Sequence, residues 1–170
     1  MFVSDEIMVP VDFAVASARL ANLVGSGALI AASVHSYDDG AGGLMRVGPA
    51  PGISKLVRAE MRELVAHGDS ALLTLRWEAV GGATGSLFPA LDADIRLFPA
   101  ADEETLLRLD GVYRTPLGAL GASLDSLVLH RVAAATIRAF IGRVAGLIAN
   151  PARDAASEPD QSWTPEPGAV

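Results

Sequence analysis

The first residues of the chain alternate between hydrophobic and polar side chains. Over residues 2–10 the hydrophobic side carries Val3, Ile7 and Val9, and the polar side carries Ser4 and Glu6. A period of two is typical of a strand with one buried and one exposed face. The pattern therefore predicts that the chain begins with a half-buried strand.

Two helical segments are predicted after this strand. Residues 12–24 carry apolar side chains at helical spacing, and Asp12 stands where it would cap the helix. Gly25 and Gly27 are predicted to end this helix. The next apolar stretch, residues 28–37, has an ambiguous period and is predicted to form a second short helix or a turn.

The middle of the chain is predicted to form four strands joined by short turns, over residues 55–65, 71–79, 91–98 and 105–113. Each strand alternates between an apolar and a charged side. The predicted apolar face carries Val57, Ala59, Met61, Leu73, Leu75, Trp77, Leu91, Ala93, Ile95, Leu97, Leu107, Leu109 and Tyr113. Short turns favour an antiparallel meander, and a sheet with one apolar face needs another element to cover that face.

The covering element is predicted to be a long helix over residues 120–150. Its predicted core stripe is Leu124, Val128, Val132, Ala135 and Ala139, flanked by Leu127, Ile137, Phe140, Val144 and Ile148. Pro151 ends the helix because proline disfavours helical backbone in the residue before it. Residues 151–170 hold four prolines and four acidic residues against one arginine, so we expect a disordered acidic tail after a single domain over residues 1–150.

Composition narrows the classes of protein to consider. The chain has 170 residues, which is enough for one domain. Although 51% of the residues are hydrophobic, no apolar run approaches the about 18 residues that are needed to span a bilayer. Asp5 and Glu6 stand where a secretory signal would carry positive charge, so we expect a cytoplasmic protein without an integral membrane segment. The net charge of −7 makes nucleic acid and anionic lipid surfaces poor partners, and the lack of cysteine excludes disulfides and thiolate chemistry.

Three segments and the order of the predicted elements resemble a known superfamily. The segments are LRWEA (75–79), LFPALDAD (87–94) and GVYRTPLG (111–118). Over about residues 2–150 the chain resembles the START-like superfamily, also called SRPBCC, and looks like its uncharacterised bacterial members. The resemblance implies an α+β helix-grip fold, in which a curved antiparallel sheet wraps around a long C-terminal helix, with two short helices after the first strand.

The same resemblance implies a cavity between the sheet and the long helix. Relatives in the superfamily carry lipids or other apolar molecules there, and a polyketide cyclase or aromatase branch performs chemistry in the corresponding space. The resemblance implies neither a particular substrate nor a cofactor.

Charged and polar residues give weaker signals for chemistry. Asp92 and Asp94 share one face of a strand about 7 Å apart, a spacing that suits a shared cation or an acid/base pair. Opposite charges on neighbouring strands explain the pair as a solvated surface, so no metal site is predicted. His35, His67 and His130 have no ligand spacing, and neither a nucleophile elbow nor a nucleotide-binding glycine motif is present.

Trp77 and Tyr113 are the two aromatic residues on the predicted inner face. Each has an apolar body and a hydrogen-bonding tip, which suits either a packed core or a ligand site. Arg114, at the end of the same strand as Tyr113, suits either a ligand carboxylate or an acid within the fold. The predicted ligand-binding residues are Met61, Leu73, Leu75, Trp77, Leu91, Ile95, Leu107, Tyr113, Arg114, Leu124 and Val128.

The leading hypothesis is a binding protein for an apolar or amphipathic small molecule, such as a lipid or a polyketide. Its first rival is a cyclase- or dehydratase-type enzyme that uses the same cavity, with Tyr113, Arg114 or a histidine as proton donor or charge stabiliser. The second rival is a packed interaction module that binds a protein. The sequence leaves these alternatives open, together with the oligomeric state, a homodimer included, and the role of Trp163 in the tail.

Overall fold

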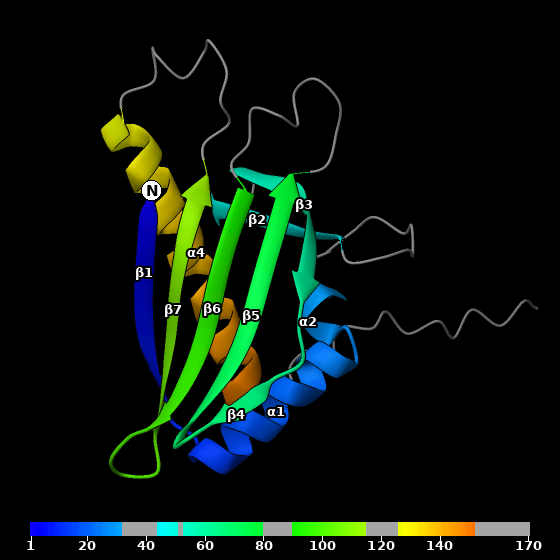
Figure 1. The fold of residues 1–170 in the computed structure, drawn as a ribbon, viewed down its shortest axis with the longest axis vertical. Helices are drawn as coiled ribbons and strands as arrows, with labels where there is room; N and C mark the ends of the chain where they lie inside the picture. Colours follow the sequence, from blue (N-terminus) through cyan, green and yellow to red (C-terminus); the bar gives the residue numbers. More distant parts are fainter. Residues whose placement is uncertain (32–43, 51–52, 80–89, 115–125, 152–170) are drawn as a thin grey trace, which may run out of the picture.

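The computed structural model describes residues 1–31, 44–50, 53–79, 90–114 and 126–151. Its strands are β1 (Phe2–Val9), β2 (Leu44–Ala50), β3 (Ile53–Met61), β4 (Val65–His67), β5 (Ser70–Ala79), β6 (Ala90–Pro99) and β7 (Thr105–Arg114). Its helices are α1 (Phe13–Gly25), α2 (Ala28–Ala31) and α4 (Ser126–Ala149). Figure 1 shows one sheet with the helices gathered behind it.

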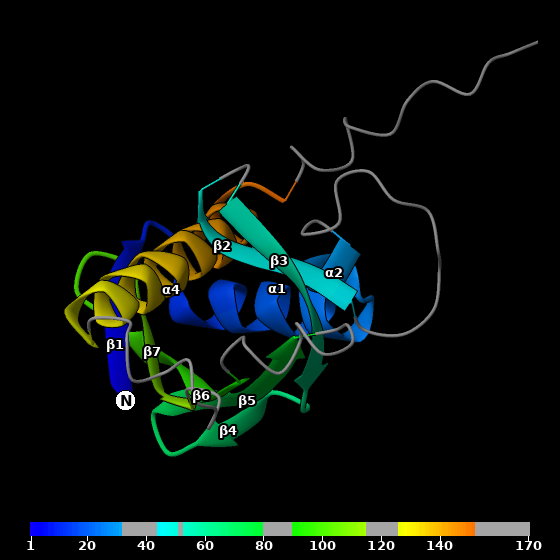
Figure 2. The same cartoon turned by 90° about the horizontal axis from the view of Figure 1, so that it is seen from above.

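The strands form one antiparallel sheet in the order β1-β7-β6-β5-β3-β2, with β4 paired to β5. Seen from above, the sheet curves so that α4 lies between its two edge strands, β1 and β2 (Figure 2). The predicted α+β architecture, a curved sheet gripping a long C-terminal helix, is therefore confirmed. Strands β5, β6 and β7 pair in sequence order as the antiparallel meander that the sequence indicated.

Strand alternation places the apolar face inward as predicted. In β6, buried Leu91, Ala93, Ile95 and Leu97 alternate with half-buried or exposed residues. The same pattern holds in β7, where Thr105, Leu107, Leu109 and Tyr113 are buried. Burial alternates from residue to residue because successive side chains of a strand point to opposite faces of the sheet, and only one face is covered.

Two strands were missed in the sequence prediction. β2 contains Gly48 and Pro49, and its register with β3 shifts between Val47 and Ala50. Glycine and proline are typical of turns, so the sequence of this segment predicts a loop. The segment is nevertheless a strand, because an edge strand can accommodate both residues at a bulge. The predicted strand over residues 55–65 ends at Met61, and the short strand β4 follows it.

The first helix begins as predicted. The Asp12 side chain caps α1 by accepting hydrogen bonds from the backbone N–H groups of Ala14 at 2.8 Å and Val15 at 3.4 Å. From the same helix, the Arg19 guanidinium donates to the carbonyl oxygens of Ile148 at 2.6 Å and Ala149 at 3.2 Å. These are unpaired C-terminal carbonyls of α4, so α1 both packs beside that helix and caps its end.

The core-facing side of α4 differs from the predicted stripe. Val132 is 47% exposed and Ala139 is exposed, whereas the predicted flanking residues Ile137, Phe140, Val144 and Ile148 are buried. Because most of the helix is apolar, spacing alone does not select its buried face; burying the larger side chains removes more apolar surface from water. Leu124 lies outside the described residues, as do the side chains of Leu127 and Val128.

The helix segment His130–Ala149 is apolar and long enough to span a bilayer by length and composition. The sequence prediction that no apolar run approaches this length is therefore corrected. Half of the segment is buried inside the protein, as in the core helix of a folded domain.

Candidate functional site

The inner face of the sheet consists of rows of side chains that lie opposite one another on neighbouring strands. Three rows are mainly aliphatic: Met61, Leu75, Ala93, Gly111 and Val3; Leu73, Ile95, Leu109 and Asp5; and Ala71, Leu97, Leu107 and Ile7. A fourth row, here called the aromatic row, contains Ala59, Trp77, Leu91 and Tyr113. It crosses β3, β5, β6 and β7 close to the ends of these strands.

The aromatic row is buried and touches the long helix. Trp77 is 1% exposed and Tyr113 is 5% exposed. The Trp77 ring meets Tyr113 edge-to-face with a centroid distance of 6.4 Å, and meets Phe140 of α4 in the same manner at 5.3 Å. Such edge-to-face contacts stabilise aromatic clusters beyond simple burial. The row therefore contacts α4 through Trp77 and Phe140.

Trp77 and Tyr113 bring polar tips into this apolar region. The Trp77 Nε1 atom is buried and forms no hydrogen bond with any described residue. Burial raises the pKa of Tyr113 to about 12, and the Trp77 indole N–H, which faces the hydroxyl, partly opposes this rise. The Tyr113 hydroxyl therefore remains protonated at neutral pH.

Most of the predicted site residues lie together in this interior. Leu73, Leu75, Trp77, Leu91, Ile95, Leu107 and Tyr113 are all buried in one hydrophobic core, and Met61 packs against it half-buried. Leu124 and the side chain of Val128 lie outside the described part of the chain. Phe140 was predicted only as a flanking residue of the helix, yet it contacts Trp77 directly.

Arg114 does not face this interior. It follows inward-facing Tyr113, so strand alternation turns its side chain to the outer face, where it pairs with Asp92. Of the two roles predicted for Arg114, the structure supports the pairing with an acid of the fold. The ligand contact predicted for Arg114 would therefore have to lie on the outer face and stays a prediction.

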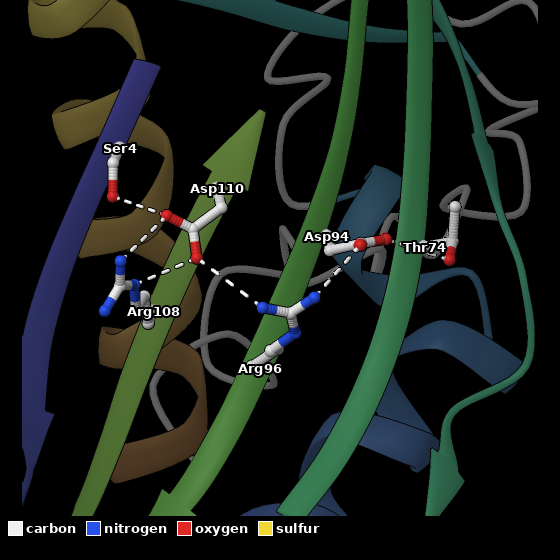
Figure 3. Close-up of polar contacts among 6 residues, drawn as sticks. All are labelled: Ser4, Thr74, Asp94, Arg96, Arg108 and Asp110. Atoms are coloured by element: carbon white, nitrogen blue, oxygen red, sulfur yellow. Dashed lines mark hydrogen bonds and ion pairs between the residues drawn. The ribbon is translucent and has the colours of Figure 1, made fainter. Parts of the chain in front are cut away.

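The outer face carries a network of charges across four strands (Figure 3). The Asp110 carboxylate accepts hydrogen bonds from the Ser4 hydroxyl at 2.7 Å and from Arg108 Nε at 2.9 Å. Arg96 reaches Asp110 at 3.9 Å and Asp94 at 3.5 Å, and Thr74 also donates to Asp94. Pairing within a strand (Arg108 with Asp110, Arg96 with Asp94) and between neighbouring strands on a solvated face accounts for these contacts, as the sequence pattern indicated for Asp94.

The Asp110 contacts predict a pH-dependent contribution to stability. Partial burial raises the pKa of this carboxyl, but the hydrogen bonds from Ser4 and Arg108 and the charges of Arg108 and Arg96 lower it overall. The folded-state pKa thus lies below the unfolded value of about 3.9, so the stabilisation is present above about pH 4 and is lost as the pH falls through the folded-state pKa. We expect Asp110→Asn to lower the free energy of unfolding by about 1–2 kcal/mol at pH 7.

The measurement is urea unfolding of both proteins between pH 7 and pH 2.5. The difference between wild type and Asp110→Asn should shrink below pH 4. Glu63→Gln, at an exposed position, serves as the charge-matched control and should change stability little at any pH. A difference for Asp110→Asn that stays constant across the range would contradict the assigned role of the carboxylate.

Elsewhere in the described structure, the titratable side chains are not arranged as a metal site or a catalytic site. No three His, Asp or Glu side chains in the described ranges gather as a metal site requires. His67 and His130 are exposed, and His35 lies outside the described residues. A surface hollow of about 420 Å³ lies between α1 and the end of α4, and another of about 270 Å³ lies over Arg58, Glu60, Arg76 and Glu78; neither is lined by the aromatic row.

No protein-family model and no curated protein sequence matches the chain. Solved structures do match. The Zhui aromatase/cyclase from Streptomyces sp. R1128 is 17% identical with a TM-score of 0.55, over 91% of this chain and 97% of that one. Ara h 8.0201 is 13% identical with a TM-score of 0.51, over 87% of this chain and 97% of that one.

A conserved protein from Geobacillus kaustophilus is 16% identical with a TM-score of 0.50, over 86% of this chain and 94% of that one. The chain has the helix-grip fold. This confirms the fold that the sequence resemblance implied. Helix-grip proteins typically bind hydrophobic ligands in a cavity. At these identities the likeness establishes the fold and leaves the ligand to be argued from the residues of this chain.

Proposed function

We propose that this protein binds an apolar or amphipathic small molecule, such as a lipid or a polyketide, between the inner face of the sheet and α4. The observation that carries the proposal is the aromatic row. It places the indole of Trp77 and the hydroxyl of Tyr113 at one end of a largely aliphatic interior. An apolar surface with a few convergent polar groups is typical of small-molecule sites.

The residues of the inner face support ligand binding better than they support catalysis. The Tyr113 hydroxyl, with its pKa raised to about 12, is a poor proton donor or base near neutral pH. His67 and His130 are exposed, and Arg114 lies on the outer face. A cyclase- or dehydratase-type activity remains the alternative use of the same space, and loss of rate in Tyr113→Phe with a defined substrate would support it.

The proposal is tested first by native mass spectrometry of the purified protein, compared with its denatured mass. We expect a retained small molecule, which organic extraction then identifies. If none is retained, the protein is incubated with a panel of lipids and polyketides and measured again. An unchanged mass after that panel would contradict the proposal and favour the packed interaction module.

A pair of variants shows whether a retained molecule lies inside the sheet. Leu91→Phe enlarges a fully buried side chain between Trp77 and Tyr113, whereas Val112→Phe adds similar bulk on the outer face, where Val112 is 47% exposed. We expect Leu91→Phe to lower the bound fraction and Val112→Phe to retain it, with folding of both checked by circular dichroism because overpacking costs about 1–3 kcal/mol. Equal retention by both variants would place the molecule elsewhere.

A further inference from the structure

The buried indole nitrogen of Trp77 restricts which chemical group a ligand can place beside it. Tryptophan Nε1–H is a hydrogen-bond donor and has no acceptor capacity. In Trp77 this atom is shielded from solvent, and no described residue accepts from it. A buried donor without a partner costs about 1–3 kcal/mol, so native proteins rarely keep one without a reason.

The buried hydroxyls around the core show how differently this protein treats other polar groups. Ser70, Thr105 and Thr136 each donate to a backbone carbonyl, at 2.8, 2.7 and 2.8 Å. Ser17 Oγ on α1 is the other buried side-chain atom without a partner in the described structure. Trp77 differs from Ser17 because it lies on the inner face of the sheet, beside the Tyr113 hydroxyl.

We infer that the ligand presents a neutral hydrogen-bond acceptor, such as a ketone or ester carbonyl oxygen, to Trp77 Nε1–H. This inference rests on the proposed function and specifies the ligand class. The carbonyl oxygen would supply the missing partner, and the protonated Tyr113 hydroxyl in the same row is available as a second donor. The apolar remainder of the molecule would lie along the aliphatic rows.

A carboxylate fits this position poorly. The described arginine side chains of the sheet lie on its outer face: Arg58, Arg76, Arg96, Arg108 and Arg114. On the inner side, the described charged residue is Asp5 of β1, which pairs with Arg138 of α4 at 3.4 Å. Burying a carboxylate without a cationic partner is costly, whereas a carbonyl oxygen needs only a donor.

The experiment uses two matched series that differ only at one functional group. The linear series is 2-dodecanone, dodecanoate and dodecane, and the fused-ring series is 9-fluorenone, fluorene-9-carboxylate and fluorene. Each compound is titrated into the ¹⁵N-labelled full-length protein, and the indole N–H resonance of Trp77 is followed by NMR. Trp163→Phe removes the other indole and assigns the resonance.

We expect at least one ketone to bind about 10-fold or more tightly than its matched hydrocarbon and carboxylate. The same ketone should move the Trp77 indole proton downfield, as hydrogen bonding to a carbonyl does. In Trp77→Phe, which keeps an aromatic ring but removes the indole donor, most of the preference for the ketone over the hydrocarbon should be lost, and the Tyr113 hydroxyl accounts for what remains. If Trp77→Phe does not fold, the shift of the Trp77 indole resonance in the wild-type protein tests the inference.

The outcomes separate this inference from the proposed function. Binding of a ketone and its hydrocarbon with equal affinity, with the indole resonance unmoved, would overturn the inference and leave the binding function intact. Tighter binding of a carboxylate would also overturn it. If no member of either series binds, both the ligand class and the proposed function are contradicted.

Discussion

Replacing Ile137 by alanine is expected to lower the free energy of unfolding by about 2–5 kcal/mol. Ile137 is fully buried on the side of α4 that faces the sheet. Truncation removes three methyl or methylene groups from the core and leaves a cavity that the surroundings fill only in part. Chemical denaturation monitored by circular dichroism gives the change in stability.

Val132→Ala is the matched control, one helical turn and a half earlier on the same helix. Val132 is 47% exposed, so its truncation should change stability by less than about 0.5 kcal/mol. The pair also tests the orientation of α4, because the stripe expected from sequence spacing included Val132 and placed Ile137 beside it. A larger loss for Val132→Ala than for Ile137→Ala would mean that the helix is rotated relative to the structure.

The strands of this protein are more predictable from sequence than its long helix. In β5, β6 and β7 charged residues alternate with apolar ones, so the inward face can be identified residue by residue. In α4 apolar residues surround most of the helix, and the buried side is selected by packing against the sheet. β2 was missed because Gly48 and Pro49 give it the composition of a loop.

The candidate site is likewise predictable from sequence only where it lies on the strands. Strand alternation is sufficient to place Trp77 and Tyr113 on the inner face, and the same rule, applied one residue further, would have turned Arg114 outward. The missing partner of Trp77 Nε1 has no sequence signal, because it depends on which side chains meet in three dimensions. The contact of Trp77 with Phe140 likewise requires the orientation of α4.

The two faces of the sheet hold their polar groups in different surroundings. On the outer face, carboxylates and guanidinium groups pair with one another across strands, as Arg96 of β6 and Asp110 of β7 do, and solvent screens them. On the inner face, the described polar tips of the aromatic row are held among apolar side chains. A hydrogen bond to Trp77 in that setting would be stronger than one on the surface, because water does not compete for the donor.

Gly111→Ala is expected to destabilise the protein by about 1–3 kcal/mol, because its new methyl group has no room. A Cβ at this position would lie 2.7 Å from the Cβ of Ala93 and 3.0 Å from both the Asp92 carbonyl oxygen and Leu91 Cδ1. Two of these three atoms belong to the backbone or to a Cβ, so β6 and β7 would have to separate next to the aromatic row. Thermal and urea unfolding measure the loss.

Gly142→Ala in α4 provides the control for the same chemical change. A Cβ there meets nothing within 4 Å, and alanine favours helix over glycine, so this variant should gain about 0.5–1 kcal/mol. The double variant Gly111→Ala with Ala93→Gly removes the opposing methyl group and should recover part of the loss, because the close contact between the two Cβ atoms no longer exists. A neutral Gly111→Ala, or a double variant less stable than the sum of its single changes, would contradict the close approach of β6 and β7 at this row.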